Sequence, residues 1–180
     1  MRDTSSAKIL TRAYYSRSTL VVARSLLGKY VVRENRKGTI AGKIVEVEAY
    51  VGPHDLACHA SKGRTRRTEV LFGPPGISYV YFIYGMYHCL NVVTEKTEFP
   101  AAVLIRALEI DGALVDGPGR LCRALDIDLS LNRLDMTAGR QLWIEDRGVR
   151  VSRDHVGTFP RIGVAYAGVW ADKLYRFRMT

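Results

Sequence analysis

The chain has 180 residues, of which 47% are hydrophobic, and 27 Lys and Arg against 18 Asp and Glu give a formal net charge of +9. This length suits one domain that buries its own core, and we expect a single domain over residues 1–180. No apolar run approaches the roughly 18 residues of a membrane span, and residues 1–20 lack the apolar region of a secretory signal. Cys58, Cys89 and Cys122 show no CxxC spacing, which argues against a disulfide framework and fits a reducing compartment.

The positive charge favours a polyanionic partner, which can be nucleic acid, an acidic membrane surface or an acidic protein. Solubility alone also explains it. Lys62, Arg64, Arg66 and Arg67 stand together in a stretch without apolar periodicity. We interpret residues 62–67 as a loop that is either simply solvated or in contact with phosphate groups.

The predicted elements are short strands with few helices. Ser16 or Ser18 caps a first helix, which Gly28 ends. Turn signals and β-branched runs then predict, in chain order, a hairpin of residues 29–33 and 39–50, a loop at 73–76, a hairpin of 77–83 and 89–93, a strand at 101–109, a short helix at 120–125, a hairpin of 141–145 and 149–152, and a closing strand at 174–179. Together these elements predict an α+β fold with a mostly antiparallel sheet.

The second hairpin has an unusual tip. Its sequence, SYVYFIYGMYHCLN at residues 78–91, places Tyr84, Met86 and Tyr87 around Gly85, where turns normally carry Asn, Asp, Ser or Gly. An apolar tip can form a dimer contact, dip into a membrane or act as a wedge between stacked bases. A net charge of +9 makes the wedge attractive, because minor-groove proteins insert apolar side chains to unstack and kink a duplex.

The stretch KIVEVEAY, residues 43–50, is a first candidate for chemistry. Strand alternation puts Val45, Val47 and Ala49 on a core face, and on the other face Ile44, Glu46, Glu48 and Tyr50. That other face is either exposed to solvent, as is usual for charged residues, or lines a cleft. Adjacent same-face positions lie roughly 6.5–7 Å apart, which is near the lower edge of the spacing for two carboxylates that hydrolyse a glycosidic bond with a water between them.

A second candidate, HDLACH at residues 54–59, contains residue types that bind metals. Its spacing matches neither a helical HExxH pair nor CxxC, and Gly52 and Pro53 favour a loop. We therefore expect no metal there, and instead a histidine that hydrogen-bonds a ligand or the backbone. We find no Ser-His-Asp order, Walker loop or dinucleotide-binding GxGxxG.

Five stretches, taken in order, are similar to one known family: VEVEAYVGPHDLACHASKG (45–63), YVYFIYGMYHCLNVV (79–93), AVLIRALE (102–109), GPGRLCRALDI (117–127) and RIGVAYAG with the following WA (161–171). The chain resembles the alkyladenine (3-methyladenine) DNA glycosylases over nearly its whole length. The resemblance implies a curved, mostly antiparallel sheet with flanking helices and a protruding hairpin, with no metal and no cofactor. It also implies that the partner is double-stranded DNA, from which alkylated and deaminated purines are flipped out and excised.

The resemblance assigns catalytic roles to three positions. Glu48 corresponds to the family's catalytic carboxylate, which directs a water to C1′ of the exposed sugar. Arg106 and the carbonyl of Ile162 help to hold that water. The matched motifs contain no pocket lysine for a Schiff base, so the resemblance implies a water nucleophile and no strand nicking.

The remaining matched positions belong to a base pocket, a wedge and a basic loop. The implied base pocket consists of Tyr50, His59, Tyr81, Asn91 and Leu104, in which Asn91 crowds the guanine 2-amino group. The implied wedge consists of Tyr84, which fills the gap in the stack, and of Met86 and Tyr87, which brace the tip. The generic candidates for phosphate contact are Arg64, Arg66 and Arg67.

Two alternatives stay open on the sequence. One is a non-catalytic protein that kinks DNA with the same wedge, and the other is a sugar hydrolase that uses Glu46 and Glu48 as a pair. The resemblance gives His54 and Cys58 no role, and Leu174-Tyr175 stands where the family pattern has Pro-Leu. We expect a monomer, because the apolar protrusion already has a use, and a cytoplasmic, nucleoid-associated location if the source is bacterial.

Overall fold

A computed structural model describes residues 7–180. The first six residues, part of the segment in which we expect no secretory signal, lie outside the described residues. The strands are β1 (Lys8–Ile9), β2 (Tyr30–Asn35), β3 (Gly38–Tyr50), β4 (Ser78–Ile83), β5 (Tyr87–Val93), β6 (Ala102–Ile110), β7 (Ala113–Asp116), β8 (Leu142–Asp146), β9 (Val156–Phe159) and β10 (Arg176–Met179). The α-helices are α1 (Arg12–Tyr15), α2 (Thr19–Leu26) and α3 (Pro118–Ala124), and the 3-10 helices are η1 (His59–Lys62), η2 (Glu69–Phe72), η3 (Leu129–Leu131), η4 (Arg153–His155) and η5 (Ala165–Trp170).

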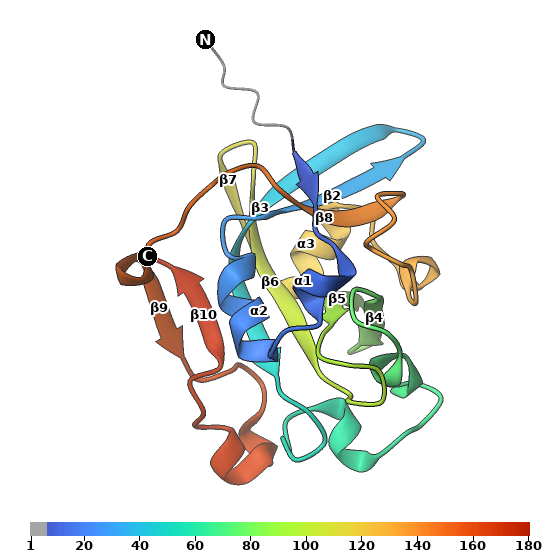
Figure 1. Ribbon diagram of the computed structural model, residues 1–180, viewed down its shortest axis with the longest axis vertical. Coiled ribbons are helices and arrows are strands. Elements are labelled where there is room, and N and C mark those ends of the chain that lie inside the picture. Colours follow the sequence, from blue (N-terminus) through green and yellow to red (C-terminus); the bar gives the residue numbers. More distant parts are fainter. Residues whose placement is uncertain (1–6) are drawn as a thin grey trace.

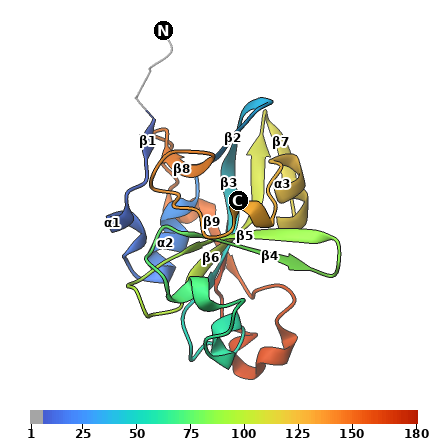
Figure 2. The same cartoon turned by 90° about the vertical axis from the view of Figure 1, so that its right-hand side faces the viewer.

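Within residues 7–180 these strands form one ten-stranded sheet with the order β1-β8-β2-β3-β6-β5-β4, to which β10 adds on β3, β9 on β10 and β7 on β6. Its strand pairs are antiparallel. The sheet curls strongly, and the β4–β5 hairpin projects from the body of the molecule (Figures 1 and 2). The predicted α+β fold with a curved sheet, flanking helices and a protruding hairpin is confirmed. In this part of the chain no helix is long and apolar enough to cross a membrane.

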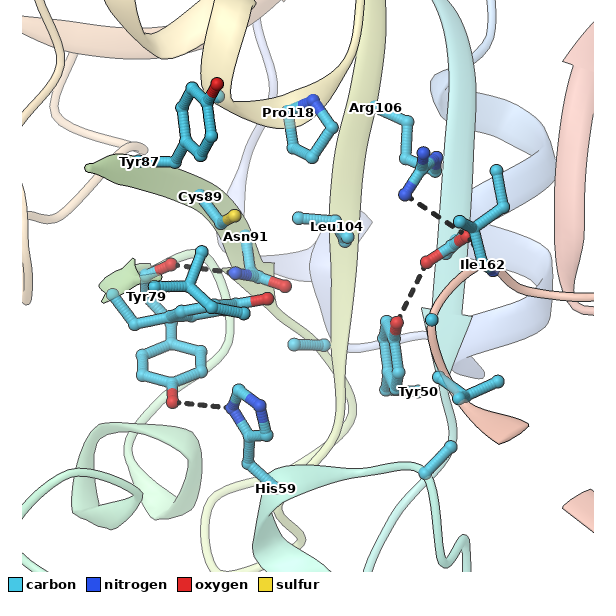
Figure 3. A pocket seen from close by; sticks show the side chains of 18 of the residues that line it. Tyr50, His59, Tyr79, Tyr87, Cys89, Asn91, Leu104, Arg106, Pro118 and Ile162 are labelled. Atoms are coloured by element: carbon cyan, nitrogen blue, oxygen red, sulfur yellow. Dashed lines mark hydrogen bonds and ion pairs between the residues drawn. The ribbon is translucent and has the colours of Figure 1, made fainter. Parts of the chain in front are cut away.

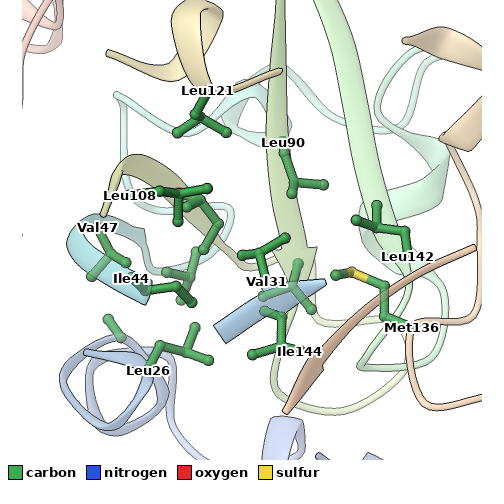
Figure 4. Close-up of a cluster of buried hydrophobic side chains, with 14 of the residues drawn as sticks. Leu26, Val31, Ile44, Val47, Leu90, Leu108, Leu121, Met136, Leu142 and Ile144 are labelled. Atoms are coloured by element: carbon green, nitrogen blue, oxygen red, sulfur yellow. The ribbon is translucent and has the colours of Figure 1, made fainter. Parts of the chain in front are cut away.

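The two faces of the central strands have different environments. One face packs into the main hydrophobic core, where the strands meet α2 and α3 (Figure 4), and it includes Val47, Ala49, Leu90, Val92, Val103 and Ile105. The alternate residues line a cavity on the opposite face, and they include Glu48, Tyr50, Cys89, Asn91, Ala102, Leu104 and Arg106. The period-2 alternation of strands therefore divides each strand between core and site.

A bulge breaks this alternation in β3 and β6. Between Ile44 and Glu46, β3 advances two residues while β6 advances one, and between Glu46 and Val47, β3 advances one residue while β6 advances two. The prediction that Ile44 shares a face with Glu46 is therefore wrong, because Ile44 is fully buried in the main core. A bulge re-aims side chains, and this one lies beside Glu46 and Arg106 at the edge of the cavity.

The first two hairpins, the closing strand and the capping position at Ser18 are confirmed, and two other details of the predicted elements are wrong. Residues 149–152 form no strand, because β8 already pairs with β2 on one edge and with β1 on the other. The short helix begins at Pro118 rather than Arg120, since a proline is preorganised for the first helical position. Ser18 is the N-cap of α2 but makes no side-chain cap bond; Glu95 accepts the Thr19 N–H instead, at 2.6 Å.

Candidate active site

The register of the sheet places four side chains in one row. Glu48 of β3 lies opposite Leu104 of β6, Leu104 lies opposite Asn91 of β5, and Asn91 lies opposite Tyr79 of β4. Directly opposed side chains in antiparallel strands lie roughly 4.5–5.5 Å apart at Cβ. Residues far apart in the sequence therefore form a continuous floor.

This floor belongs to a cavity of about 810 Å³. The cavity brings together most of the predicted site residues, which are Glu48, Tyr50, His59, Arg67, Tyr81, Tyr84, Tyr87, Asn91, Leu104, Arg106 and Ile162. Met86, Arg64 and Arg66 do not line it. Figure 3 shows Glu48's partners Tyr50, Arg106 and Ile162 on one side, and Tyr79, His59 and Asn91 on the other.

Glu48 is a buried carboxylate with several partners. It has no exposed surface, and it accepts hydrogen bonds from the Tyr50 hydroxyl at 2.8 Å and from the Ile162 N–H at 2.8 Å. Arg106 Nη1 lies 3.4 Å from its Oε1. Burial raises the pKa of Glu48 above its ordinary value, and Arg106, the Ile162 N–H and the Tyr50 hydroxyl act against that rise. The interpretation that this face of the strand is exposed to solvent is therefore wrong.

Glu46 is also buried, but it holds arginines rather than facing an open site. Arg106 Nε lies 3.3 Å from Glu46, and Arg176 and Arg178 of β10 lie 3.0 and 3.2 Å from it. Arg106 thus sits between two carboxylates. Because three guanidinium groups surround Glu46, this carboxylate is poorly placed to activate a water, which argues against a hydrolase that uses Glu46 and Glu48 as an equivalent pair.

Aromatic side chains form the walls of the cavity. The edge of the His59 ring meets Tyr81 with centroids 4.8 Å apart, and His59 Nδ1 hydrogen-bonds the Tyr79 hydroxyl at 2.9 Å. Burial, together with the nearby charges of Arg67 and Lys62, lowers the pKa of His59 to about 4. The imidazole is therefore neutral at pH 7, so this wall offers a hydrogen-bonding edge without a charge.

Asn91 and Leu104 close the floor between these walls. The Asn91 Nδ2 donates to the Tyr79 carbonyl at 3.0 Å, which fixes the amide plane. Both residues are almost fully buried. Their side chains therefore set the depth of the cavity rather than its electrostatics.

The hairpin tip stands at the mouth of the cavity. The Met86 N–H donates to the Ile83 carbonyl at 3.2 Å, and the two central residues of this turn, Tyr84 and Gly85, have φ of 54° and 65°. Positive φ at both central positions is the type I′ turn that matches the twist of a hairpin. It is an uncommon conformation for tyrosine, and 78% of the Tyr84 surface is exposed.

Tyr87 and Met86 lie on different sides of this hairpin. Tyr87 lines the main cavity and packs against α3, where a Cβ added to Gly119 would lie 2.4 Å from Tyr87 Cδ1. Met86 is exposed and borders a smaller hollow beside Cys122 and Arg123 of α3. The glycine at position 119 therefore permits the close approach of α3 to Tyr87, which pairs with Ile83 directly below the tip of the hairpin.

The three predicted phosphate contacts differ in their surroundings. Arg64 pairs with Glu98 and lies over the Phe72 ring at 4.3 Å. Arg67 lies over the Tyr81 ring at 5.0 Å and reaches the cavity. Arg66 is exposed, and no ion pair joins it to another of the described residues.

The HDLACH stretch contains a residue that sequence reasoning missed. Asp55 forms a two-pronged ion pair with Arg161, and both side chains are fully buried. The Cys58 thiol points to the Pro100 carbonyl, and the His54 ring lies 5.4 Å from Trp170. The position of Arg161 in the family-like stretch RIGVAYAG was the available signal, but it did not identify the partner.

Known proteins match the chain over most of its length. A family model described as "Methylpurine-DNA glycosylase (MPG)" matches residues 13–180. A protein of Legionella pneumophila (strain Lens) is 52% identical over 171 residues, which cover 93% of this chain and 92% of that protein. Proteins of Myxococcus xanthus (strain DK1622) and Methanocella arvoryzae (strain DSM 22066 / NBRC 105507 / MRE50) are 51% and 50% identical, covering 93% and 94% of this chain and 88% and 91% of their own lengths. All three are named "Putative 3-methyladenine DNA glycosylase".

Fold, cavity and comparisons together define the class of protein: a DNA glycosylase, a hydrolase that acts on N-glycosyl bonds. Within that class the chain belongs to the methylpurine-DNA glycosylase family, whose model it matches over residues 13–180. The predicted family is thereby confirmed, and it places the protein in DNA repair of alkylation damage.

Proposed function

We propose that the chain is a monofunctional glycosylase that flips an alkylated or deaminated purine, such as 3-methyladenine or hypoxanthine, out of duplex DNA and hydrolyses its N-glycosyl bond in base excision repair. The observation that carries this proposal is the buried Glu48 carboxylate, with its three partners, on the wall of an aromatic cavity of about 810 Å³. A base inside a duplex cannot reach such a cavity, so the nucleotide must leave the stack, at a cost of about a few kcal/mol.

The exposed Tyr84 is suited to offset part of that cost. Its ring at the tip of the projecting hairpin enters the minor groove and occupies the space of the extruded nucleotide. Tyr87, packed against Gly119, and Met86 brace the tip and contact the neighbouring sugars or bases. Arg64, Arg66 and Arg67 contact phosphates, so binding weakens steeply as salt rises.

The extruded purine lies between Tyr50 and the pair His59 and Tyr81. Electron-rich rings favour electron-poor, positively charged methylated bases through cation–π contact. Asn91, held by the Tyr79 carbonyl at 3.0 Å, crowds the guanine 2-amino group and so disfavours undamaged guanine. Leu104 supports the floor beneath the base.

Hydrolysis then uses a water held by Glu48, Arg106 and the Ile162 carbonyl. Glu48 takes its proton as general base and stabilises the positive charge that develops on the sugar. The water attacks C1′ on the face opposite the base, the C–N bond breaks, and the base leaves with the bonding electrons. A methylated base such as 3-methyladenine already carries positive charge and leaves without further protonation.

Two further features belong to this proposal. No lysine lies among the described residues that line the cavity, so no Schiff base forms and the DNA strand is not nicked. The enzyme acts as a monomer in the cytoplasm, with the nucleoid if the source is bacterial, because its apolar tip is used for DNA rather than for a second copy.

The test is chromatography of the products released from duplexes that contain one hypoxanthine, and from a methylated duplex of A·T pairs. We expect free hypoxanthine and free 3-methyladenine, with strands that break only after alkali treatment. Tight binding to the damaged duplex without release of any base would instead indicate a non-catalytic DNA-kinking protein.

A further inference from the structure

Asp55 and Arg161 form the most deeply buried ion pair near the cavity. Arg161 Nη1 lies 2.5 Å from Asp55 Oδ2 and Nη2 lies 2.8 Å from Oδ1, with both side chains fully buried. Neither residue lines the cavity. A buried charge pair is weak evidence for stability, because the loss of hydration can exceed the attraction, so its position next to the site calls for another explanation.

The pair joins three segments behind the site. Asp55 accepts the N–H groups of Val51 and Ala57, each at 3.1 Å, which shapes the loop after β3. Arg161 donates to the Ala49 carbonyl of β3 at 2.9 Å and to the Trp170 carbonyl of η5 at 3.1 Å. A single guanidinium therefore ties the end of β3 to residues 161–170.

The two residues next to these anchoring points hold Glu48. Ile162 follows Arg161 and gives its N–H to Glu48, and Tyr50 follows Ala49 and gives its hydroxyl. The Arg161 guanidinium also lies 4.8 Å from the centre of the Tyr50 ring. Two of the three groups that orient the catalytic carboxylate are thus fixed in place through Arg161.

We propose that the Asp55–Arg161 pair is a positioning device for Glu48, which sets the orientation of the carboxylate by fixing the Ile162 N–H and the Tyr50 hydroxyl. This inference rests on the proposed function of Glu48 as the base. Arg106 Nη1 lies 3.4 Å from Glu48 Oε1, the oxygen that also accepts the Ile162 N–H, and Tyr50 bonds Oε2, so displacement of the two donors would leave Arg106 as the one remaining partner of these three. A carboxylate that loses hydrogen-bond donors binds its proton more tightly.

The test is the pH dependence of single-turnover release of 3-methyladenine by Arg161→Lys, which keeps the charge but cannot make all four bonds. We expect the plateau rate to fall by about 10²-fold, as for a small misplacement of a catalytic group. We also expect the acidic limb to move to higher pH, because Glu48 loses the donors that stabilise its charged form. The other charged or titratable groups around Glu48, which the substitution leaves in place, are Glu46, Tyr50, Tyr81, Cys89, Arg106 and Arg176.

Arg12→Lys is the matched control. Arg12 likewise bonds an aspartate, Asp135, and a carbonyl, that of Pro75, each at 2.6 Å, but it lies outside the cavity. The Arg12→Lys variant should leave the plateau rate and the acidic limb of the pH profile unchanged. If Arg161→Lys lowers the melting temperature and yet keeps the wild-type plateau and limb, the pair is merely structural and the proposal is overturned.

A second variant keeps the proposal testable if Arg161→Lys fails to fold. Asp55→Asn keeps the size of the Asp55 side chain but removes the charge that pairs with Arg161, and it should move the plateau and the limb in the same directions. No change in either would overturn the proposal. Full activity of Glu48→Gln would instead overturn the proposed function, whereas an inactive Glu48→Gln beside a fully active Arg161→Lys overturns only the positioning role.

Discussion

The cavity wall at Glu48 and the hairpin tip at Tyr84 are built in opposite ways. Glu48 has no exposed surface and is held by two hydrogen bonds and an ion pair. Tyr84 is 78% exposed and is presented by a type I′ turn in which it adopts a φ of 54°. A backbone conformation of this kind costs of order 1–3 kcal/mol and persists where the surrounding structure enforces it.

This difference separates two tasks of the proposed reaction. Hydrolysis needs a carboxylate within tenths of an ångström of its working position, so its surroundings are packed and fully bonded. Opening a base stack needs an apolar surface that meets water until DNA arrives. One region therefore depends on position and the other on exposure, and substitutions in the two regions should fail in different ways.

The largest effect should come from Glu48→Gln, which keeps the shape and removes the charge. We expect single-turnover release of hypoxanthine from a duplex to fall by at least about 10²–10⁴-fold, the contribution of a general base, while binding to an abasic duplex changes little. Glu109→Gln, at an ion pair with Lys43 away from the cavity, is the control and should keep wild-type activity. Unchanged release by Glu48→Gln would show that hydrolysis does not depend on the Glu48 carboxylate, and the proposed division of tasks between the two regions would be wrong.

Tyr84→Ala should have the next largest effect. Stacking of an aromatic ring on a base is worth about 1–3 kcal/mol, so release from a duplex should fall by about 5- to 150-fold. Tyr84→Phe keeps the ring and should stay close to wild type. A wild-type rate for Tyr84→Ala in single-turnover assays would show that the tip does not contribute to extrusion.

The pH dependence of base release should show which residue of the cavity controls the rate at low pH. Burial raises the pKa of Glu48, so its carboxylate becomes protonated at a higher pH than an exposed glutamate. Release of 3-methyladenine, whose base already carries charge, should therefore fall about tenfold per pH unit below a limb that lies above the ordinary glutamate range. His59, with a pKa lowered to about 4, should not add a limb near pH 6.5, and its substitution by Asn should leave the Glu48 limb in place.

Gly119→Ala tests the support of the hairpin. Its new Cβ would lie 2.4 Å from Tyr87 Cδ1, so the ring must move and the hairpin with it. Overpacking of this kind costs about 1–3 kcal/mol of stability, and we expect a smaller loss of duplex activity than for Tyr84→Ala. Calorimetry of the double variant with Tyr87→Ala should show less destabilisation than the two single variants added together, because the ring that clashes is absent.

Arg66→Ala should have a smaller effect than the substitutions above. Removal of one phosphate contact lowers the slope of log affinity against log salt by about 1 and weakens binding to all sequences alike. Arg64→Ala should change the slope less, because Arg64 already pairs with Glu98 and stacks on Phe72. Equal slopes for wild type and Arg66→Ala in fluorescence titrations would exclude Arg66 as a phosphate contact.

The parts of the fold that were predictable are those with local signals. β-branched runs bounded by turn residues predicted the hairpins of β2 with β3 and of β4 with β5, because pairing across a short turn depends on nearby residues. The short strands β7 and β9 were missed, since each depends on a partner strand for its extended conformation. Residues 149–152 carry the same valine-rich pattern but find both edges of β8 occupied.

In the site, too, some residues could be predicted from the sequence and others depend on contacts between distant segments. The resemblance to a known family predicted Glu48, Tyr50, His59 and Asn91, which the structure brings into one cavity. Alternation alone misplaced Ile44, because a bulge inserts a residue without any local sequence signal. The partnership of Asp55 with Arg161 spans 106 positions, and no local pattern can encode a contact between residues so far apart.

The most direct test compares Glu48→Gln and Tyr84→Ala on the same hypoxanthine-containing strand, single-stranded and in a duplex, by single-turnover release of the free base. If Glu48 performs the hydrolysis and Tyr84 opens the stack, Glu48→Gln fails on both substrates, whereas Tyr84→Ala fails on the duplex and approaches wild type on the single strand. Equal losses for Tyr84→Ala on both substrates, or normal release by Glu48→Gln on either, would contradict this account.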